Sequence, residues 1–345
     1  MRGSATRADN RDHGKRAVFA ALAANLGIAV TKFVAFVITG SASLLAEAVH
    51  SVADSGNQAL LLIGRSRAQR EETEEHQFGF GAERYFYAFI VALVLFTVGA
   101  VFSLYEGVER IAHPEHVDDP VVAFAVLVIA MILEGFSLRT AIAESSAARG
   151  AASWLAFIRR AKAPELPIVL LEDTAALSGL AFALLGVALA VITGNGQWDG
   201  AGSIAIGVLL AAVAVILAVE MKSLLIGESA GRDIERDIVA AIEGGPEVDG
   251  VIHLRTMHVG PDTLLVAAKI AVVGSESAVQ IARGIDAAER RIRSAVPIAQ
   301  LIFLEPDLYR AGQDDPADPA IQAARRASRL RGRRGRPAAR GLRPR

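Results

Sequence analysis

The chain of 345 residues contains no cysteine, which excludes disulfide frameworks, thiolate zinc sites, iron–sulfur clusters and cysteine nucleophiles. Charged residues make up only 21%, against about 25% in a typical soluble domain, and aromatic residues 6%. Basic and acidic residues almost cancel to a net charge of −1, so no nucleic-acid partner is expected from overall basicity. Hydrophobic residues, by contrast, reach 52% and are concentrated between residues 17 and 226.

Apolar stretches long enough to cross a bilayer follow one another through this region, since about 30 Å of hydrocarbon needs roughly 20 helical residues. The six stretches cover 17–39, 42–64, 85–111, 120–143, 166–193 and 201–226. The loops after the second and fourth stretches carry arginine or lysine, whereas the loops at 39–41, 112–119 and 194–200 carry neither, and the positive-inside rule then puts both termini in the cytoplasm. We expect an all-α bundle of six transmembrane helices in an inner or plasma membrane.

The segments on either side of this bundle differ in character. Residues 1–16 are polar and form a cytoplasmic N-terminal segment without a cleavable-signal pattern. Residues 227–312 alternate amphipathic helices with strands, and their α-β-β-α-β order predicts a small cytoplasmic α+β domain of the ferredoxin-like kind. The expected elements are helices at 228–243 and 277–294 and strands at 251–258, 263–273 and 299–305.

The last residues, 313–345, hold ten arginines and no lysine, and they have little to bury. We therefore expect a disordered tail, which is either a solvated terminus or a contact with lipid headgroups or nucleic acid.

Ionisable residues inside apolar spans are costly and need partners or a function. In the second span His50 and Asp54 are four residues apart, so they lie on one helix face, and an imidazole and a carboxylate at this spacing can bind a divalent cation. The fifth span opens with the adjacent acids Glu172 and Asp173, which diverge by about 100° around the helix. Together with one or both of these acids, His50 and Asp54 would give three or four ligands, a number that suits tetrahedral zinc.

A purely structural interpretation of these residues is also open. In this interpretation His50 and Asp54 form a hydrogen bond with each other and bind no metal. Glu172 and Asp173 are solvated at the cytoplasmic interface. Other polar residues in the spans fit pairing or snorkelling better than ligation; these are Asn25, Lys32, Asn57, Gln58 and Glu134.

The runs Thr39–Asp54 and His76–Tyr85 resemble the cation diffusion facilitator family of divalent-metal/proton antiporters, and the resemblance extends from about residue 17 to residue 306. In that family four side chains of the second and fifth spans bind the transported ion, protons exchange at the same ligands, and the protein is a homodimer. The resemblance implies a zinc exporter without a cofactor, not an enzyme, whose metal ligands are His50, Asp54, Glu172 and Asp173.

The sequence departs from the family pattern in three places. Glu172-Asp173 stands where a histidine and an aspartate four apart are usual, as in the branch with the zinc transporter of animal mitochondria, so which acid ligates stays open. In the loop, Phe80 replaces a histidine that often accompanies His76. In the C-terminal domain, His253 and His258 are five apart and point to opposite faces of a strand, which favours packing and dimerisation over metal binding.

The chemistry of such a site fits antiport, because ligands lose protons to bind metal and expel it when they are protonated again. An inward proton gradient would then drive cytoplasmic metal outward by alternating access, with His50 as the natural exchanging group. Glycines at 179, 186, 202 and 207 allow close helix approach or rocking, and packing explains them equally well.

Alternatives remain at this point. A mixed nitrogen and oxygen ligand set also accepts manganese, iron or cobalt. A passive channel and a non-transporting membrane scaffold are further alternatives, whereas an intramembrane metalloprotease is disfavoured because the sequence has no His-Glu-x-x-His motif.

Overall fold

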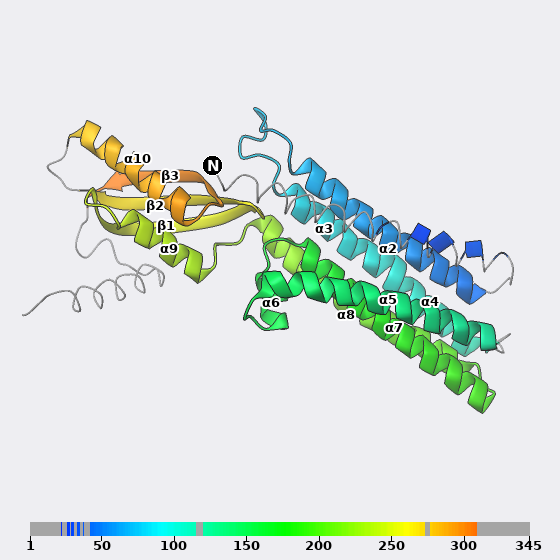
Figure 1. Cartoon of the computed structure of the whole chain (residues 1–345). Coiled ribbons are helices and arrows are strands. Elements are labelled where there is room, and N and C mark those ends of the chain that lie inside the picture. Colours follow the sequence, from blue (N-terminus) through cyan, green and yellow to red (C-terminus); the bar gives the residue numbers. More distant parts are fainter. Residues whose placement is uncertain are drawn as a thin grey trace, which may run out of the picture. The chain divides into compact units, whose positions relative to one another are not determined.

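The computed structural model describes residues 42–114, 120–272 and 277–308, together with scattered helical residues between 22 and 37. The chain separates into two compact units, Met1–Ile226 and Gly227–Arg345. Figure 1 shows long helices in the first unit and a sheet with two helices in the second. The expected N-terminal segment, most of the first span and the arginine-rich tail lie outside the described residues.

The helices expected from the second to the sixth apolar stretch are all present in the first unit. Their bounds are α2 (Ala42–Arg67), α3 (Glu83–Val94), the π-helical segment η1 (Leu95–Val101), α4 (Phe102–Ala112), α5 (Pro120–Arg149), α7 (Glu165–Thr193) and α8 (Gln197–Ile226). A short helix that was not predicted, α6 (Trp154–Arg160), begins where the Ser153 side chain accepts a hydrogen bond from the Ala156 N–H. Gly194, with a φ of 66°, ends α7 in the left-handed conformation.

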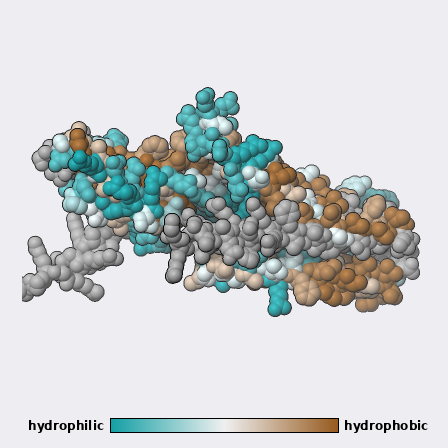
Figure 2. All heavy atoms as spheres, turned by 45° about the horizontal axis from the view of Figure 1, so that its top comes forward, coloured by the Kyte–Doolittle hydropathy of each residue, from teal (hydrophilic) through white to brown (hydrophobic). Residues whose placement is uncertain are grey.

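Four helical stretches of the described residues are long and apolar enough to cross a membrane, namely Glu83–Ala112, Pro120–Arg149, Glu165–Thr193 and Gln197–Ile226. Helix α2 is not among them, and it carries Asp54, Arg65 and Arg67. Large apolar side chains face outward along the four stretches; Phe136, Ile192 and Val219 are 63%, 80% and 60% exposed. Figure 2 shows the same hydrophobic surface over the long helices, as expected for helices in contact with lipid.

Glycine brings α8 close to α4 and to α7. A Cβ on Gly107 of α4 would lie 2.8 Å from the Gly200 carbonyl oxygen, and one on Gly202 would lie 3.0 Å from the Phe182 carbonyl oxygen of α7. The expectation of close approach is therefore confirmed for Gly202, as it is for Gly207, where a Cβ would lie 2.6 Å from Leu104. At Gly179 a Cβ would meet Ile206 at an ordinary 3.6 Å.

The second unit consists of α9 (Arg232–Ile242), β1 (Val248–Gly260), β2 (Thr263–Val272), α10 (Ala278–Ala295) and β3 (Ala299–Asp307). Strands β1 and β2 pair antiparallel across the predicted turn, and β2 pairs parallel with β3 through the α10 crossover. Both helices share one apolar core with the sheet, in which Ile238, Leu264 and Ile292 are fully buried. The opposite face of the sheet keeps exposed side chains.

The first helix of this unit begins later than predicted, at Arg232 rather than residue 228. The preceding residues instead follow the strand β1. The Glu228 carbonyl accepts from the His258 N–H at 2.8 Å, and the Ala230 N–H donates to Thr256 Oγ1 at 3.0 Å. These bonds hold residues 228–230 extended, so the helix cannot include them.

Candidate metal centre

Two adjacent acids lie buried in α7, two turns inside its N-terminal end. Glu172 is 7% exposed and Asp173 is 6% exposed. They belong to a helix of 29 residues that is apolar enough to span a membrane. Buried carboxylates in such a helix need hydrogen-bond donors, and each of the two has one.

Glu172 is held from α2. The Asn57 side chain donates from Nδ2 to Glu172 Oε1 at 3.0 Å, and Asn57 itself is 1% exposed. The half-buried Asp54 lies one turn earlier in α2, and its carboxyl is close enough to Glu172 for a side-chain hydrogen bond. Glu172 therefore belongs with the polar face of α2.

Asp173 is held from a different helix. The Ser137 hydroxyl of α5 donates to Asp173 Oδ2 at 2.9 Å. Asp54 still lies within electrostatic reach of this carboxyl. Adjacent helical residues diverge by about 100°, and here that divergence directs the two acids toward α2 and α5 respectively.

Of the four predicted ligands, Asp54 lies within electrostatic range of both Glu172 and Asp173, whereas the side chain of His50, one turn before Asp54, lies outside the described part of the chain. Among the described side chains no group of three His, Asp or Glu residues is close enough to hold a metal ion. Ser137 was missed by sequence reasoning, because a single hydroxyl in an apolar run gives no spacing signal.

An ion pair joins the start of α7 to the start of α3. Arg84 contacts both carboxylate oxygens of Glu165, at 2.6 Å from Nε and 2.8 Å from Nη2. Glu165 precedes Glu172 by seven residues, which places both on the same face of α7 about 10 Å apart along the axis. The bidentate pair therefore fixes the end of the helix that carries the candidate site.

In the loop after α2, His76 lies against an aromatic side chain. The His76 ring stacks on Phe80 with ring centroids 4.6 Å apart. Phe80 offers no ligand atom, so His76 has an aromatic neighbour at this position and not a second histidine.

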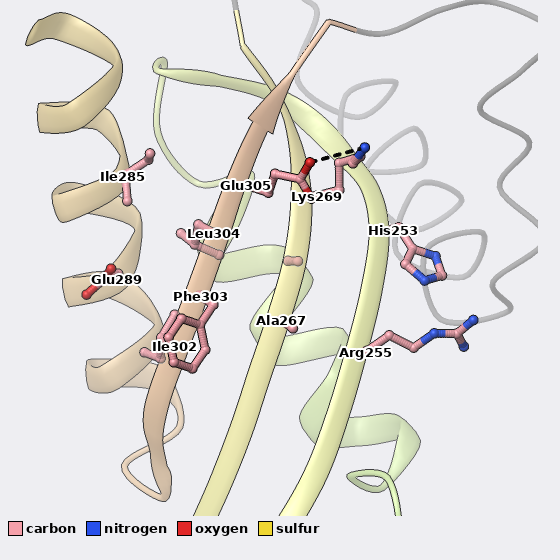
Figure 3. A pocket seen from close by; sticks show the side chains of 11 residues that line it. His253, Arg255, Ala267, Lys269, Ile285, Glu289, Ile302, Phe303, Leu304 and Glu305 are labelled. Atoms are coloured by element: carbon pink, nitrogen blue, oxygen red, sulfur yellow. Dashed lines mark ion pairs between the residues drawn. The ribbon is translucent and has the colours of Figure 1, made fainter. Parts of the chain in front are cut away.

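The sheet of the second unit carries an open groove of about 490 Å³ (Figure 3). His253 lines it, whereas His258 is buried, so the two histidines point to opposite faces as expected. The Lys269 ammonium lies 3.1 Å from Asp307 Oδ2 and 3.4 Å from Glu305 Oε1, and these carboxylates raise the pKa of Lys269. The acids at the end of β3 are thus already paired with a cation of the chain.

Comparison with known proteins gives matches over the same region. Residues 18–226, more than half of the chain, match the family described as the cation efflux transmembrane domain. The chain is 35% identical over 232 residues to the mitochondrial proton-coupled zinc antiporter SLC30A9 of Xenopus laevis. The matched region covers 66% of this chain and 41% of that protein. It is 31% identical over 263 residues to metal tolerance protein C4 of Arabidopsis thaliana, with coverage of 76% and 58%. The chain thus spans less than half the length of the Xenopus relative.

A solved structure of the MamM C-terminal domain, in a doubly substituted form, is 26% identical and covers 23% of this chain and 93% of its own, with a TM-score of 0.22. The family match is the broader finding, and it includes all the buried acids described above. The chain is therefore a multi-pass integral membrane protein that belongs to the cation efflux family, a family of transporters and not of enzymes.

Proposed function

We propose that this chain exports a divalent metal cation, zinc in the first place, from the cytoplasm in exchange for protons. The observation that carries the proposal is the pair of buried acids in α7, each with a hydrogen-bond donor on another helix of the bundle. A scaffold gains nothing from two adjacent carboxylates inside an apolar helix, whereas a cation pathway requires them. The SLC30A9 relative is named as a proton-coupled zinc antiporter.

The proposed ligand set is His50, Asp54, Glu172 and Asp173. Two carboxylates balance the charge of a divalent cation, and the third carboxylate and the imidazole remain as groups that can exchange protons. Each ligand must be deprotonated to bind metal, so proton entry from the outside expels the ion and metal entry from the cytoplasm expels protons. Alternating access around this site would couple the two fluxes.

The proposed architecture adds a first membrane span to the helices that the structure describes. It has six membrane spans in an inner or plasma membrane, with both termini in the cytoplasm. Two chains form a homodimer, and the second unit, which has the ferredoxin-like order of elements, contributes packing and dimerisation. Support comes from the loop charges and from the α-β-β-α-β order of α9 to β3.

A second candidate ion follows from the donor types. The described part of the cluster is rich in oxygen, since it contains three carboxylates, an amide and a hydroxyl. Oxygen donors of this kind suit manganese, and the imidazole of the proposed ligand His50 suits iron(II) as well as zinc. Manganese or iron export by the same site is therefore the alternative to zinc, with cobalt as a further family ion.

The test is transport by the full-length protein in liposomes that contain a zinc-sensitive dye, under an imposed pH gradient. Wild type should move zinc only when the gradient is present. Asp54→Ala and Glu172→Ala should each abolish the flux, while Glu109→Gln, an exposed acid of α4 outside the cluster, should leave it unchanged. Manganese and iron(II) are added as competitors to rank the ions.

The outcomes separate the candidates. Gradient-dependent zinc flux that is lost in both variants supports the antiporter. Zinc flux that does not respond to the pH gradient identifies a passive channel. A correctly folded wild type without flux of any tested metal favours the scaffold and rejects the proposal.

A further inference from the structure

Asn57 is one of the most deeply buried polar residues of the described helices, at 1% exposure. It lies three residues after Asp54, so the two side chains share one face of α2. A buried amide has two polar ends, and both need a partner when water is excluded.

One end of this amide is used. The Nδ2 group donates to Glu172 Oε1 at 3.0 Å. A carboxylate oxygen can only accept, so the amide nitrogen must face Glu172 and the amide oxygen must face elsewhere. The direction of the side chain therefore follows from the chemistry of its neighbour.

The other end is not used. Asn57 Oδ1 is buried and accepts no hydrogen bond from the residues that the structure describes. Ser55, two residues earlier and also buried, differs, because its hydroxyl donates to the Ser51 carbonyl at 2.9 Å within its own helix. Gln58 Oε1 of the same helix is also buried without a hydrogen-bond partner among the described residues, so what distinguishes Asn57 is that its amide nitrogen donates to Glu172.

An amide oxygen is a regular ligand of divalent cations that take oxygen donors. The carboxyls of Asp54 and Glu172 lie beside Asn57, and they attract a cation to the same place. A cation in this position would give Asn57 Oδ1 the partner that it lacks among the described residues.

We propose that Asn57 is part of the cation-binding site, where its Nδ2 group orients Glu172 and its Oδ1 atom binds the transported divalent cation. This inference rests on the proposed function of the same site. It adds a neutral oxygen ligand to the four predicted side chains, which widens the accepted ions from zinc toward manganese.

Zinc and manganese binding to the detergent-solubilised full-length protein tests the inference. We expect Asn57→Leu, which keeps the branched shape and loses both polar atoms, to weaken zinc binding by about 10- to 100-fold. Asn57→Asp keeps the oxygen but cannot donate to Glu172, so it should bind metal more tightly than Asn57→Leu. Ser55→Ala is the matched control and should bind like wild type.

Transport in liposomes supplies a second readout. A lost ligand should raise the KM for zinc by about the same factor as the dissociation constant and change kcat less. A purely structural role would instead lower kcat and the unfolding temperature at an unchanged KM. If Asn57→Leu does not fold, the smaller Asn57→Ser is measured in its place.

Two results overturn the inference. The first is a folded Asn57→Leu or Asn57→Ser variant with wild-type metal affinity and KM. The second is an Asn57→Asp variant that binds metal as weakly as Asn57→Leu, which limits Asn57 to orienting Glu172. A wild type that neither binds nor transports any tested metal is a different result, since it rejects the proposed function itself.

Discussion

At the residue scale, the two adjacent acids of α7 have separate partners. Glu172 accepts from Asn57 of α2, and Asp173 accepts from Ser137 of α5. Each bond joins two helices, so each acid is oriented by an element other than its own. Hydrogen bonds of this kind to a ligand group commonly set metal affinity.

We predict that Ser137→Ala weakens zinc binding about tenfold, because the Asp173 carboxylate loses the donor that orients it. Isothermal titration of the full-length protein with zinc measures the change. Thr140→Ala is the control, since the Thr140 hydroxyl donates at 3.0 Å to the Phe136 carbonyl of its own helix. Unchanged affinity in Ser137→Ala would remove Asp173 from the ligand set and leave Glu172.

Sequence alone could predict the acids of the site but not their hydrogen-bond donors. His50, Asp54, Glu172 and Asp173 stand out because charges are rare in apolar spans. The sequence pattern of Asn57 indicates only a structural role. Its contact with Glu172 depends on how α2 and α7 are rotated against each other, and spacing within one helix carries no information on that rotation.

At the element scale, α4 and α8 approach each other through glycine. A Cβ on Gly107 would lie 2.7 Å from Ile204 Cγ1 and 2.8 Å from the Gly200 carbonyl oxygen. Such distances leave no room for a methyl group between the two backbones. The pair is therefore packed by contact between backbones, as is common for helices in membranes.

We predict that Gly107→Ala destabilises the protein by about 1–3 kcal/mol, because the added methyl group forces α4 away from α8. Thermal unfolding in detergent measures the effect. Gly135→Ala on α5 is the matched control, since nothing lies within 4 Å of its added Cβ. Equal unfolding temperatures for the two variants would contradict the close approach of α4 and α8.

In the second unit, the pairing of Lys269 with Asp307 and Glu305 predicts a dependence on alkaline pH. The two carboxylates raise the pKa of Lys269 above its ordinary value of 10.5, so the charged lysine stabilises the folded state. This stabilisation is complete below pH 10.5 and is lost as the pH rises through the higher folded value.

The unfolding temperature of wild type should therefore fall more steeply above pH 10.5 than that of Lys269→Met, which keeps the apolar stem without the charge. The difference between the two proteins cancels the titration of groups that they share. Parallel curves would show that the ion pairs do not contribute in solution.

The elements themselves were mostly predictable. Long apolar runs bounded by glycine and charge predict α7 to within one residue and the start of α5, whereas α5 continues six residues beyond the predicted end, to Arg149. The π-helical segment η1 was not predictable, because residues 85–111 form one apolar run whose winding is decided by packing. The sequence pattern extends the helix to residues 228–230, but in the structure these residues bond to β1. The bonding residues of β1 are distant in the sequence, so the local pattern does not reveal these bonds.

At the scale of the whole molecule, the absence of cysteine makes the proposed orientation testable with single introduced thiols. Gln69→Cys lies in the arginine-bearing loop after α2, and Asn195→Cys lies in the loop between α7 and α8; both positions are exposed. We predict that a membrane-impermeant maleimide added outside intact cells labels Asn195→Cys and not Gln69→Cys. The reverse pattern would place both termini outside.

Composition and charge could predict the division into a membrane unit and an α+β unit, because burial in lipid and burial in a small core require different patterns. They could not predict which metal is carried. That choice depends on distances between donors from several helices, and the same residue types accept zinc, manganese or iron.

The segment η1 affects where single-residue insertions and deletions can be tolerated in the chain. A π turn holds more residues than an α turn, so residues 95–101 accommodate one residue that a continuous α-helix would not. Deleting one residue there would let the span wind as a regular α-helix and would leave α4 facing nearly the same way, whereas a deletion within α3 would turn α4 by about 100°. After a deletion in α3 Gly107 would no longer face Gly200, whereas a deletion in the exposed loop at residues 69–78 would leave every helix face where it is. Single-residue length changes in related chains should therefore occur within residues 95–101 or in that loop, and avoid α3.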